Sequence, residues 1–244
     1  ISARFGVSTT FEELNYFAQI SLGFRPPQIN EAYRLQKKQN VTDLDSETLT
    51  MIEIGSRFDR DTVNGSVSLY KSKKKNSIFR DAENFIVDNG KTDHEGIELS
   101  LNWLISSNNT VSSNITYGDH RYDFETDTSM REKIRIGNKI DTSPKLMANL
   151  IWDLNLRNDS SISFEIEHMS SYYTDAANLH EYDGHTLYHA RFNKNLSTSM
   201  KGFVRVDNIF DKAYAERADF NAFGGDRYFP GLPREFYVGI EYTF

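Results

Sequence analysis

The chain has 244 residues, a formal net charge of −7 and no cysteine. The acidic balance argues against a nucleic-acid-binding surface, which needs a basic stripe, and the missing cysteines exclude disulfides, thiolate metal sites and cysteine nucleophiles. No apolar run approaches the roughly 18 residues that a membrane-spanning helix requires, but the alternating strands of a membrane barrel give no such run and stay possible.

Apolar and polar residues alternate along most of the chain. Between Leu14 and Phe24 one face is apolar and the other polar or small, except for Phe17. This period of two is typical of strands, and the pattern predicts an all-β fold of about eleven strands, with a short helix near residues 29–35. The alternating segments lie near residues 1–8, 14–25, 50–58, 63–73, 97–103, 111–117, 146–152, 162–166, 184–194, 199–209 and 236–244.

Short and long connections alternate along the chain between these segments. The short ones lie near residues 9–12, 59–62, 105–109, 154–159 and 195–198, and the long ones near 26–47, 74–90, 119–138, 173–183 and 211–231. A meander through a membrane sorts its loops in this way, whereas unstructured loops longer than about 12–15 residues are uncommon in soluble domains. The pattern predicts an antiparallel transmembrane β-barrel meander in an outer membrane, with long loops extracellular and the C-terminus periplasmic. A soluble β-sandwich that binds a ligand is the alternative.

Aromatic residues make up 13% of the chain, and many of them end a strand. In a membrane barrel they would form girdles at the two interfaces, whereas in a sandwich they would lie in the core. The expected girdle residues are Phe24, Phe58, Trp103, Tyr117, Trp152, Tyr172, Phe192, Tyr242 and Phe244.

Several motifs resemble those of TonB-dependent outer-membrane receptors. The C-terminal part contains Val206-Asp-Asn-Ile-Phe-Asp-Lys-Ala-Tyr214, then Arg227-Tyr-Phe-Pro-Gly231, and ends on Phe236-Tyr-Val-Gly-Ile-Glu-Tyr-Thr-Phe244. Upstream, Gly23-Phe-Arg-Pro-Pro27, Asn30-Glu-Ala-Tyr33 and the segment 47–55 are similar to further motifs of that family, in the same order. Pro26 and Leu232-Pro233 depart from the family pattern.

The resemblance implies a 22-stranded barrel closed by an N-terminal plug, with a TonB-contacting segment before the plug. About eleven strands and no plug are present, so residues 1–244 are expected to form a single, incomplete domain, the C-terminal half of the barrel. The implied partners are the TonB–ExbB–ExbD complex, contacted through the missing N-terminal part, outer-membrane lipid and lipopolysaccharide, and the barrel-assembly machinery. That machinery is expected to recognise Ile240, Tyr242 and Phe244.

The function that the resemblance implies is energised uptake of a scarce nutrient chelate, foremost a ferric siderophore, with no enzymatic activity and no cofactor. Cobalamin, copper or a glycan are alternative substrates for the same class of receptor. A self-contained outer-membrane protease or lipase barrel is a different class, but the sequence contains neither G-x-S-x-G nor H-E-x-x-H.

Ferric chelates are commonly anionic, so guanidinium and phenol groups on the loops are the expected ligand contacts. The candidates are Arg34, Arg217, Arg227, Tyr228 and Tyr182. His180 and His185 lie in one acidic loop and are candidate ligands for Zn²⁺, Cu²⁺ or iron, although an ordinary solvated loop is the favoured interpretation. The basic run 71–75 with Arg80 is expected to face lipopolysaccharide phosphates or solvent.

Overall fold

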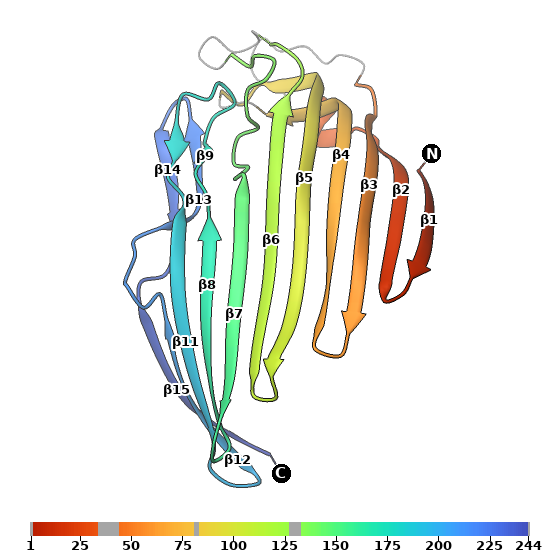
Figure 1. Cartoon of the computed structure of the whole chain (residues 1–244). Coiled ribbons are helices and arrows are strands. Elements are labelled where there is room, and N and C mark those ends of the chain that lie inside the picture. The colour runs from red at the N-terminus through yellow and green to blue at the C-terminus, as the bar shows by residue number, and fades with distance from the viewer. Residues whose placement is uncertain (1, 34–43, 81–82, 127–132, 244) are drawn as a thin grey trace.

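The computed structural model describes residues 2–33, 44–80, 83–126 and 133–243, and these form one long curved sheet with loops gathered at one end (Figure 1). Eleven antiparallel strands follow one another in the order β1-β2-β3-β4-β5-β6-β7-β8-β11-β12-β15, and two two-stranded ladders, β9–β10 and β13–β14, lie in the loops. The strands are β1 (Ala3–Phe11), β2 (Leu14–Arg25), β3 (Glu47–Arg60), β4 (Val63–Arg80), β5 (Ile86–Ser106), β6 (Asn109–Tyr122), β7 (Leu146–Leu156), β8 (Ser160–Met169), β9 (Tyr172–Tyr173), β10 (Glu181–Tyr182), β11 (His185–Asn195), β12 (Met200–Asp207), β13 (Ala215–Asn221), β14 (Gly225–Pro230) and β15 (Glu235–Tyr242), and the one helix is α1 (Ile29–Tyr33). The predicted meander of eleven strands is confirmed.

The register places the apolar residues of neighbouring strands side by side on one face of the sheet. Ile20 pairs with Ile52, and Leu150 with Ile166. We call this band the apolar belt; on each of the eleven strands at least one of its large side chains is exposed, namely Phe5, Ile20, Ile54, Leu69, Ile97, Tyr117, Leu150, Ile166, Tyr188, Val204 and Val238. A sandwich would bury this face against a second sheet, so the sandwich interpretation is wrong.

Charged residues mark the end of the belt toward the long loops. Two positions beyond Leu69 and Ile97, the same face carries Lys71 and Glu95, whose Nζ and Oε2 atoms lie 2.8 Å apart. Lys73 pairs in the same way with Asp93, at 3.1 Å. Acidic partners therefore accompany the predicted basic run, which favours a solvated mixed-charge face over a purely basic one.

The short turns all lie at one end of the sheet, here called the turn end, and the long connections at the other, the loop end (Figure 1). Within the described residues β1 and β15 each pair with a single neighbour, so the sheet is an open arc. Helix α1 confirms the short helix near residues 29–35 as far as Tyr33. No helix among the described residues is long and apolar enough to span a membrane.

Three predicted loops contain more structure than expected, and one of them, 173–183, holds the ladder β9–β10. β4 and β5 extend to Arg80 and from Ile86, which reduces the predicted loop 74–90 to residues 81–85. The predicted loop 211–231 holds the hairpin β13–β14.

Two small buried clusters at the loop end hold these loops in place. One contains Tyr172, Tyr182, Ala215 and Ala218, and the other contains Tyr122, Ile134 and Ala176 with Phe79, Phe124 and Ile140 packed against them. The prediction that Tyr172 belongs to an interfacial girdle is wrong, because its side chain is buried beneath β13.

Candidate functional site

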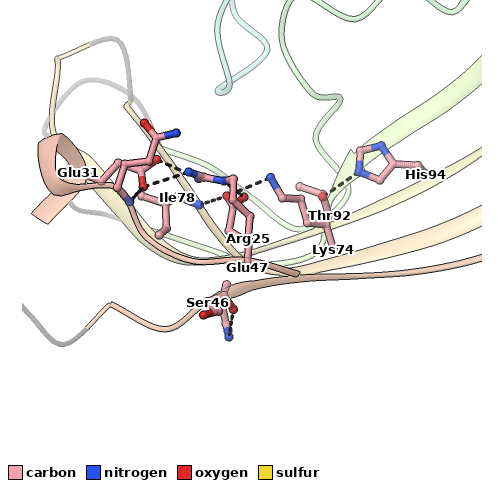
Figure 2. A network of polar contacts seen from close by, with 10 residues as sticks. Arg25, Glu31, Ser46, Glu47, Lys74, Ile78, Thr92 and His94 are labelled. Carbon is pink, nitrogen blue, oxygen red and sulfur yellow. Dashed lines mark hydrogen bonds and ion pairs between the residues drawn. The ribbon is translucent and has the colours of Figure 1, made fainter. Parts of the chain in front are cut away.

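A buried carboxylate joins β2, β3 and β4 at the loop end (Figure 2). Glu47 accepts hydrogen bonds from Arg25 Nε at 2.5 Å and from the Ile78 N–H at 2.8 Å, and Lys74 Nζ lies 3.0 Å from it. The other two nitrogens of Arg25 donate hydrogen bonds to the carboxylate of Glu31 in α1, at 2.9 and 3.1 Å. We call Arg25, Glu31, Glu47 and Lys74 the clamp.

The side chains of the clamp bind one another, and the clamp lies beyond the apolar belt. Glu47 is only 4% exposed. Burial alone would raise the pKa of Glu47, but the hydrogen bonds from Arg25, from the Ile78 N–H and from Lys74 outweigh it and lower the pKa to about 2. The clamp therefore fixes α1 and the strand ends, with all three guanidinium nitrogens of Arg25 bound to carboxylates.

A second buried carboxylate lies in the hairpin β13–β14. Asp219 faces Arg227 across the hairpin, and its Oδ1 accepts a hydrogen bond from Arg227 Nε at 2.6 Å. Arg217, two residues earlier on the same strand, places Nη2 3.1 Å from the other oxygen. The Arg217 guanidinium also lies over the Phe229 ring, 5.8 Å from its centroid. One carboxylate therefore orients two guanidinium groups, and both remain more than half exposed.

Two phenol groups fix the hairpin to the loop beneath it. The Tyr172 hydroxyl accepts a hydrogen bond from the Ala218 N–H at 2.8 Å, and the Tyr182 hydroxyl accepts one from the Ala215 N–H at 3.0 Å. The ring centroids of the two tyrosines lie 5.4 Å apart. Since these bonds hold the backbone of β13, the guanidinium groups that β13 and β14 carry are held in place as well.

The two arginines line a pocket of about 200 Å³, here called the hairpin pocket. Arg80 lines it too, so the pocket is lined by three guanidinium groups and by the carboxyl groups of Asp219 and Asp141. Burial raises the pKa of Asp141, against the lowering effect of the hydrogen bond that the Tyr122 hydroxyl donates to it at 2.6 Å. The pocket therefore carries an excess of positive charge.

One hydroxyl of the hairpin pocket has no partner among the described residues. Thr174 Oγ1 is buried and forms no hydrogen bond there. Buried polar groups normally have a partner, so this hydroxyl can accept or donate a hydrogen bond to a molecule in the pocket.

Of the predicted ligand contacts, the structure brings Arg217 and Arg227 together. Tyr182 is buried, and its hydroxyl serves the hairpin backbone. Tyr228 is exposed, with its ring centroid 6.3 Å from that of Tyr182. Arg34 lies outside the described residues.

His180 and His185 do not converge on one point. His180 stacks on Phe220 at 3.8 Å and lies 3.3 Å from Asp226, while His185 Nδ1 lies 2.9 Å from the Tyr182 hydroxyl. No group of three or more potential metal ligands occurs in the described ranges. Of the predicted assembly residues, Ile240 and Tyr242 lie on the belt face of β15, and Phe244 lies outside the described residues.

Two arrangements were missed from the sequence. The clamp joins Arg25, Glu31 and Glu47, one residue from each of three upstream motifs, which were matched only as separate segments. His94 and His120 form a close pair on β5 and β6.

Comparison with known protein families identifies the same type of β-barrel sheet. The family model described as TonB dependent receptor-like, beta-barrel, matches residues 1–209. No curated protein sequence matches the chain.

Three solved structures share the fold across nearly the whole chain. They are the siderophore receptor PiuA from Acinetobacter baumannii (TM-score 0.81, 17% identity, 98% of this chain), the ferric citrate transporter FecA (0.80, 20%, 98%) and the ferric-catecholate import receptor Fiu from E. coli K12 (0.78, 19%, 99%). The chain spans 35%, 38% and 34% of their lengths. Since the family model covers most of the sequence, the chain belongs to the TonB-dependent receptor β-barrel family.

Proposed function

We propose that this chain is the C-terminal half of the barrel of an outer-membrane receptor that imports an anionic ferric chelate, such as a ferric siderophore, by TonB-coupled transport. The observation that carries the proposal is the hairpin pocket, where Asp219 orients Arg217 and Arg227 beside Arg80. In this proposal the loop end faces the cell exterior, and the turn end and C-terminus face the periplasm.

The chemistry of the hairpin pocket suits an anion. A guanidinium group binds carboxylate or phenolate oxygens through paired N–H donors, and Arg227 uses only Nε on Asp219. A volume of about 200 Å³ takes one arm of a chelate rather than a whole metal complex. The pocket would therefore be one subsite, and loops and a plug supplied by the rest of the receptor would complete the binding site.

The partners follow from the same proposal. TonB–ExbB–ExbD would act through the N-terminal part of the receptor, and the barrel-assembly machinery would read Ile240, Tyr242 and Phe244. Lipid covers the apolar belt, which would otherwise leave a contiguous apolar surface in water. Lipopolysaccharide would contact the mixed-charge face that begins at Lys71 and Glu95.

The first test is the DNA upstream of the codon for Ile1. The proposal expects an open reading frame that continues upstream through about eleven more alternating segments, a plug and a TonB-contacting segment. An upstream sequence that encodes no such elements would sink it.

The second test is binding to the full-length receptor in detergent, with ferric chelates of graded charge. We expect a negatively charged ferric tris-catecholate or ferric citrate to bind more tightly than neutral ferrichrome, and cationic ferrioxamine B to bind least. Cyanocobalamin, a copper chelate and a maltodextrin complete the panel. Binding of one of these without binding of any ferric chelate would replace iron as the substrate and leave the receptor class unchanged.

A further inference from the structure

His94 of β5 and His120 of β6 face each other directly across the two strands. Their Nδ1 atoms lie 3.0 Å apart, and their ring centroids 5.1 Å apart at an interplanar angle of 54°. Both side chains lie on the polar face of the sheet, beyond the level of the apolar belt. Two imidazoles that share one hydrogen bond between nitrogens cannot both donate, so the pair offers at least one lone pair.

The spacing of the two nitrogens fits the coordination sphere of a metal ion. Imidazole nitrogens bind Zn²⁺ at about 2.0–2.1 Å, so two neighbouring ligands of one ion are separated by roughly 3 Å. The observed 3.0 Å between the Nδ1 atoms matches this separation, and rotation of the two rings would let both nitrogens point at one ion.

A hydroxyl group lies next to the remote nitrogen of the His94 ring. Thr92 Oγ1 lies 2.8 Å from His94 Nε2 and can accept the Nε2 proton, which leaves Nδ1 with its lone pair (Figure 2). On the other side of the pair, a Cβ at position 118 would lie 2.5 Å from His120 Nε2, so Gly118 leaves room at this nitrogen. Metal binding would move the Nδ1 proton of His120 to Nε2, so the proton count of the pair would stay unchanged.

One of the two rings, that of His120, borders a hollow. The hollow has a volume of about 390 Å³ and is also lined by Gly118, Lys139 and Tyr172. The charged groups around the two rings are mixed, since Lys74 and Lys139 oppose a cation and Asp93 and Asp119 favour it. Water in the hollow can supply the remaining ligands.

We propose that His94 and His120 bind one divalent transition-metal ion, with water completing its coordination. Two imidazole ligands suit Cu²⁺, Ni²⁺ and Zn²⁺, and among divalent ions of the first row Cu²⁺ binds most tightly to a given nitrogen site. The site is separate from the hairpin pocket, and its existence does not depend on which chelate the receptor transports.

The test is titration of the full-length receptor in detergent with CuCl₂, followed by calorimetry and by electron paramagnetic resonance. We expect one Cu²⁺ per chain, with hyperfine coupling to imidazole nitrogen, and weaker binding of Zn²⁺ at the same site. His94→Ala and His120→Ala are each expected to weaken Cu²⁺ binding by at least about tenfold, and Thr92→Val by about tenfold through loss of the supporting hydroxyl.

His168→Ala is the matched control. His168 also lies beside a threonine hydroxyl, with 2.9 Å from its Nδ1 to Thr186 Oγ1, but it has no second imidazole within hydrogen-bond distance in the described part of the chain. This variant is expected to bind Cu²⁺ like the wild type. The proposal is overturned if the wild type shows no imidazole-coordinated Cu²⁺, or if His94→Ala/His120→Ala retains wild-type affinity and spectrum. Unchanged heat-modifiable migration of the variants in gels shows that the barrel is folded.

Discussion

Glu47 and Asp219 are two buried carboxylates at the same end of the sheet, and each binds two cationic side chains. The cations differ. Arg25 uses all three guanidinium nitrogens on Glu47 and Glu31, and Lys74 is largely covered. Arg217 and Arg227 use one nitrogen each on Asp219 and remain 64% and 51% exposed.

The comparison separates a structural ion-pair network from a receptive one. A buried carboxylate is costly unless it is paired, so both carboxylates need their cations for stability. Where every guanidinium nitrogen is already bound to a carboxylate, as for Arg25 in the clamp, the network joins backbone segments. Where donors remain and face a pocket, the same chemistry orients groups that can bind an anion.

The largest effect is expected from Glu47→Ala. The change leaves Lys74 without its partner and frees the Ile78 N–H, and breaking a buried pair costs about 3–5 kcal/mol. Hydrogen exchange followed by mass spectrometry should show protection lower by roughly a hundredfold to a few thousandfold in the peptides around α1 and residues 76–80. Glu13→Ala is the control, because Glu13 pairs with Arg60 at the turn end with both side chains more than half exposed, and it should cost at most about 1 kcal/mol. Equal losses in the two variants would contradict the structural role of the clamp.

Acidification should lower stability in the clamp but not in the hairpin pocket. The pKa of Glu47 is lowered from 4.5 to about 2, so its contribution to stability is present above pH 4.5 and is lost as the pH falls toward 2. The pKa of Asp141, in the hairpin pocket, is raised above 3.8, so its contribution is present below that pH and is lost as the pH rises through the raised value. Protection factors corrected for intrinsic exchange should therefore fall on acidification around Ile78 and not around Asp141. A parallel fall at both places would count against this distinction.

Arg227→Ala should weaken chelate binding, while Asp219 keeps Arg217 as its partner. A hydrogen bond to a charged group contributes about 1.5–3 kcal/mol, so the affinity for ferric citrate or a ferric tris-catecholate should fall by roughly 10- to 100-fold. Arg217→Ala should act in the same direction, and Arg205→Ala, at a pair with Asp207 outside the hairpin pocket, is the control. Calorimetry with the full-length receptor measures the difference. An unchanged affinity in both hairpin variants would remove the hairpin pocket from the binding site.

The sequence predicts the sheet well because every belt strand carries its own alternation. It does not predict the extra length of β4, because residues 71–75 are Lys-Ser-Lys-Lys-Lys and offer no apolar face. The hairpin β13–β14 was missed for a similar reason, since it packs through two alanines against tyrosines of another loop. The clamp cannot be predicted from spacing along the chain either, because the number of loop residues between Arg25 and Glu47 does not determine whether their side chains meet.

The His94–His120 pair could not be predicted from the sequence because it depends on a register shift of one residue between β5 and β6. Counting outward from the turn between β5 and β6 pairs Ser106 with Asn109, and continuing that count would place His94 opposite Arg121. A register shift between Leu104 and Ser106 moves the partner to His120 and brings the two rings to the same face. A bulge of this kind leaves no mark in the sequence pattern.

The smallest effects should come from the two tyrosines that were predicted together as ligand contacts. Tyr182→Phe removes the hydroxyl that accepts from the Ala215 N–H, and loss of one buried hydrogen bond should lower the protection of β13 by about 1 kcal/mol. Tyr228→Phe removes an exposed hydroxyl, so β13 should keep its protection, and chelate affinity should fall by a few-fold if that hydroxyl touches the ligand. Since Tyr182 holds the strand that carries Arg217, its loss should weaken binding indirectly, in proportion to the loosening of β13. A Tyr182→Phe receptor that loses affinity while β13 keeps full protection would show that the phenol contacts the ligand itself, and Tyr182 would then belong with the receptive residues.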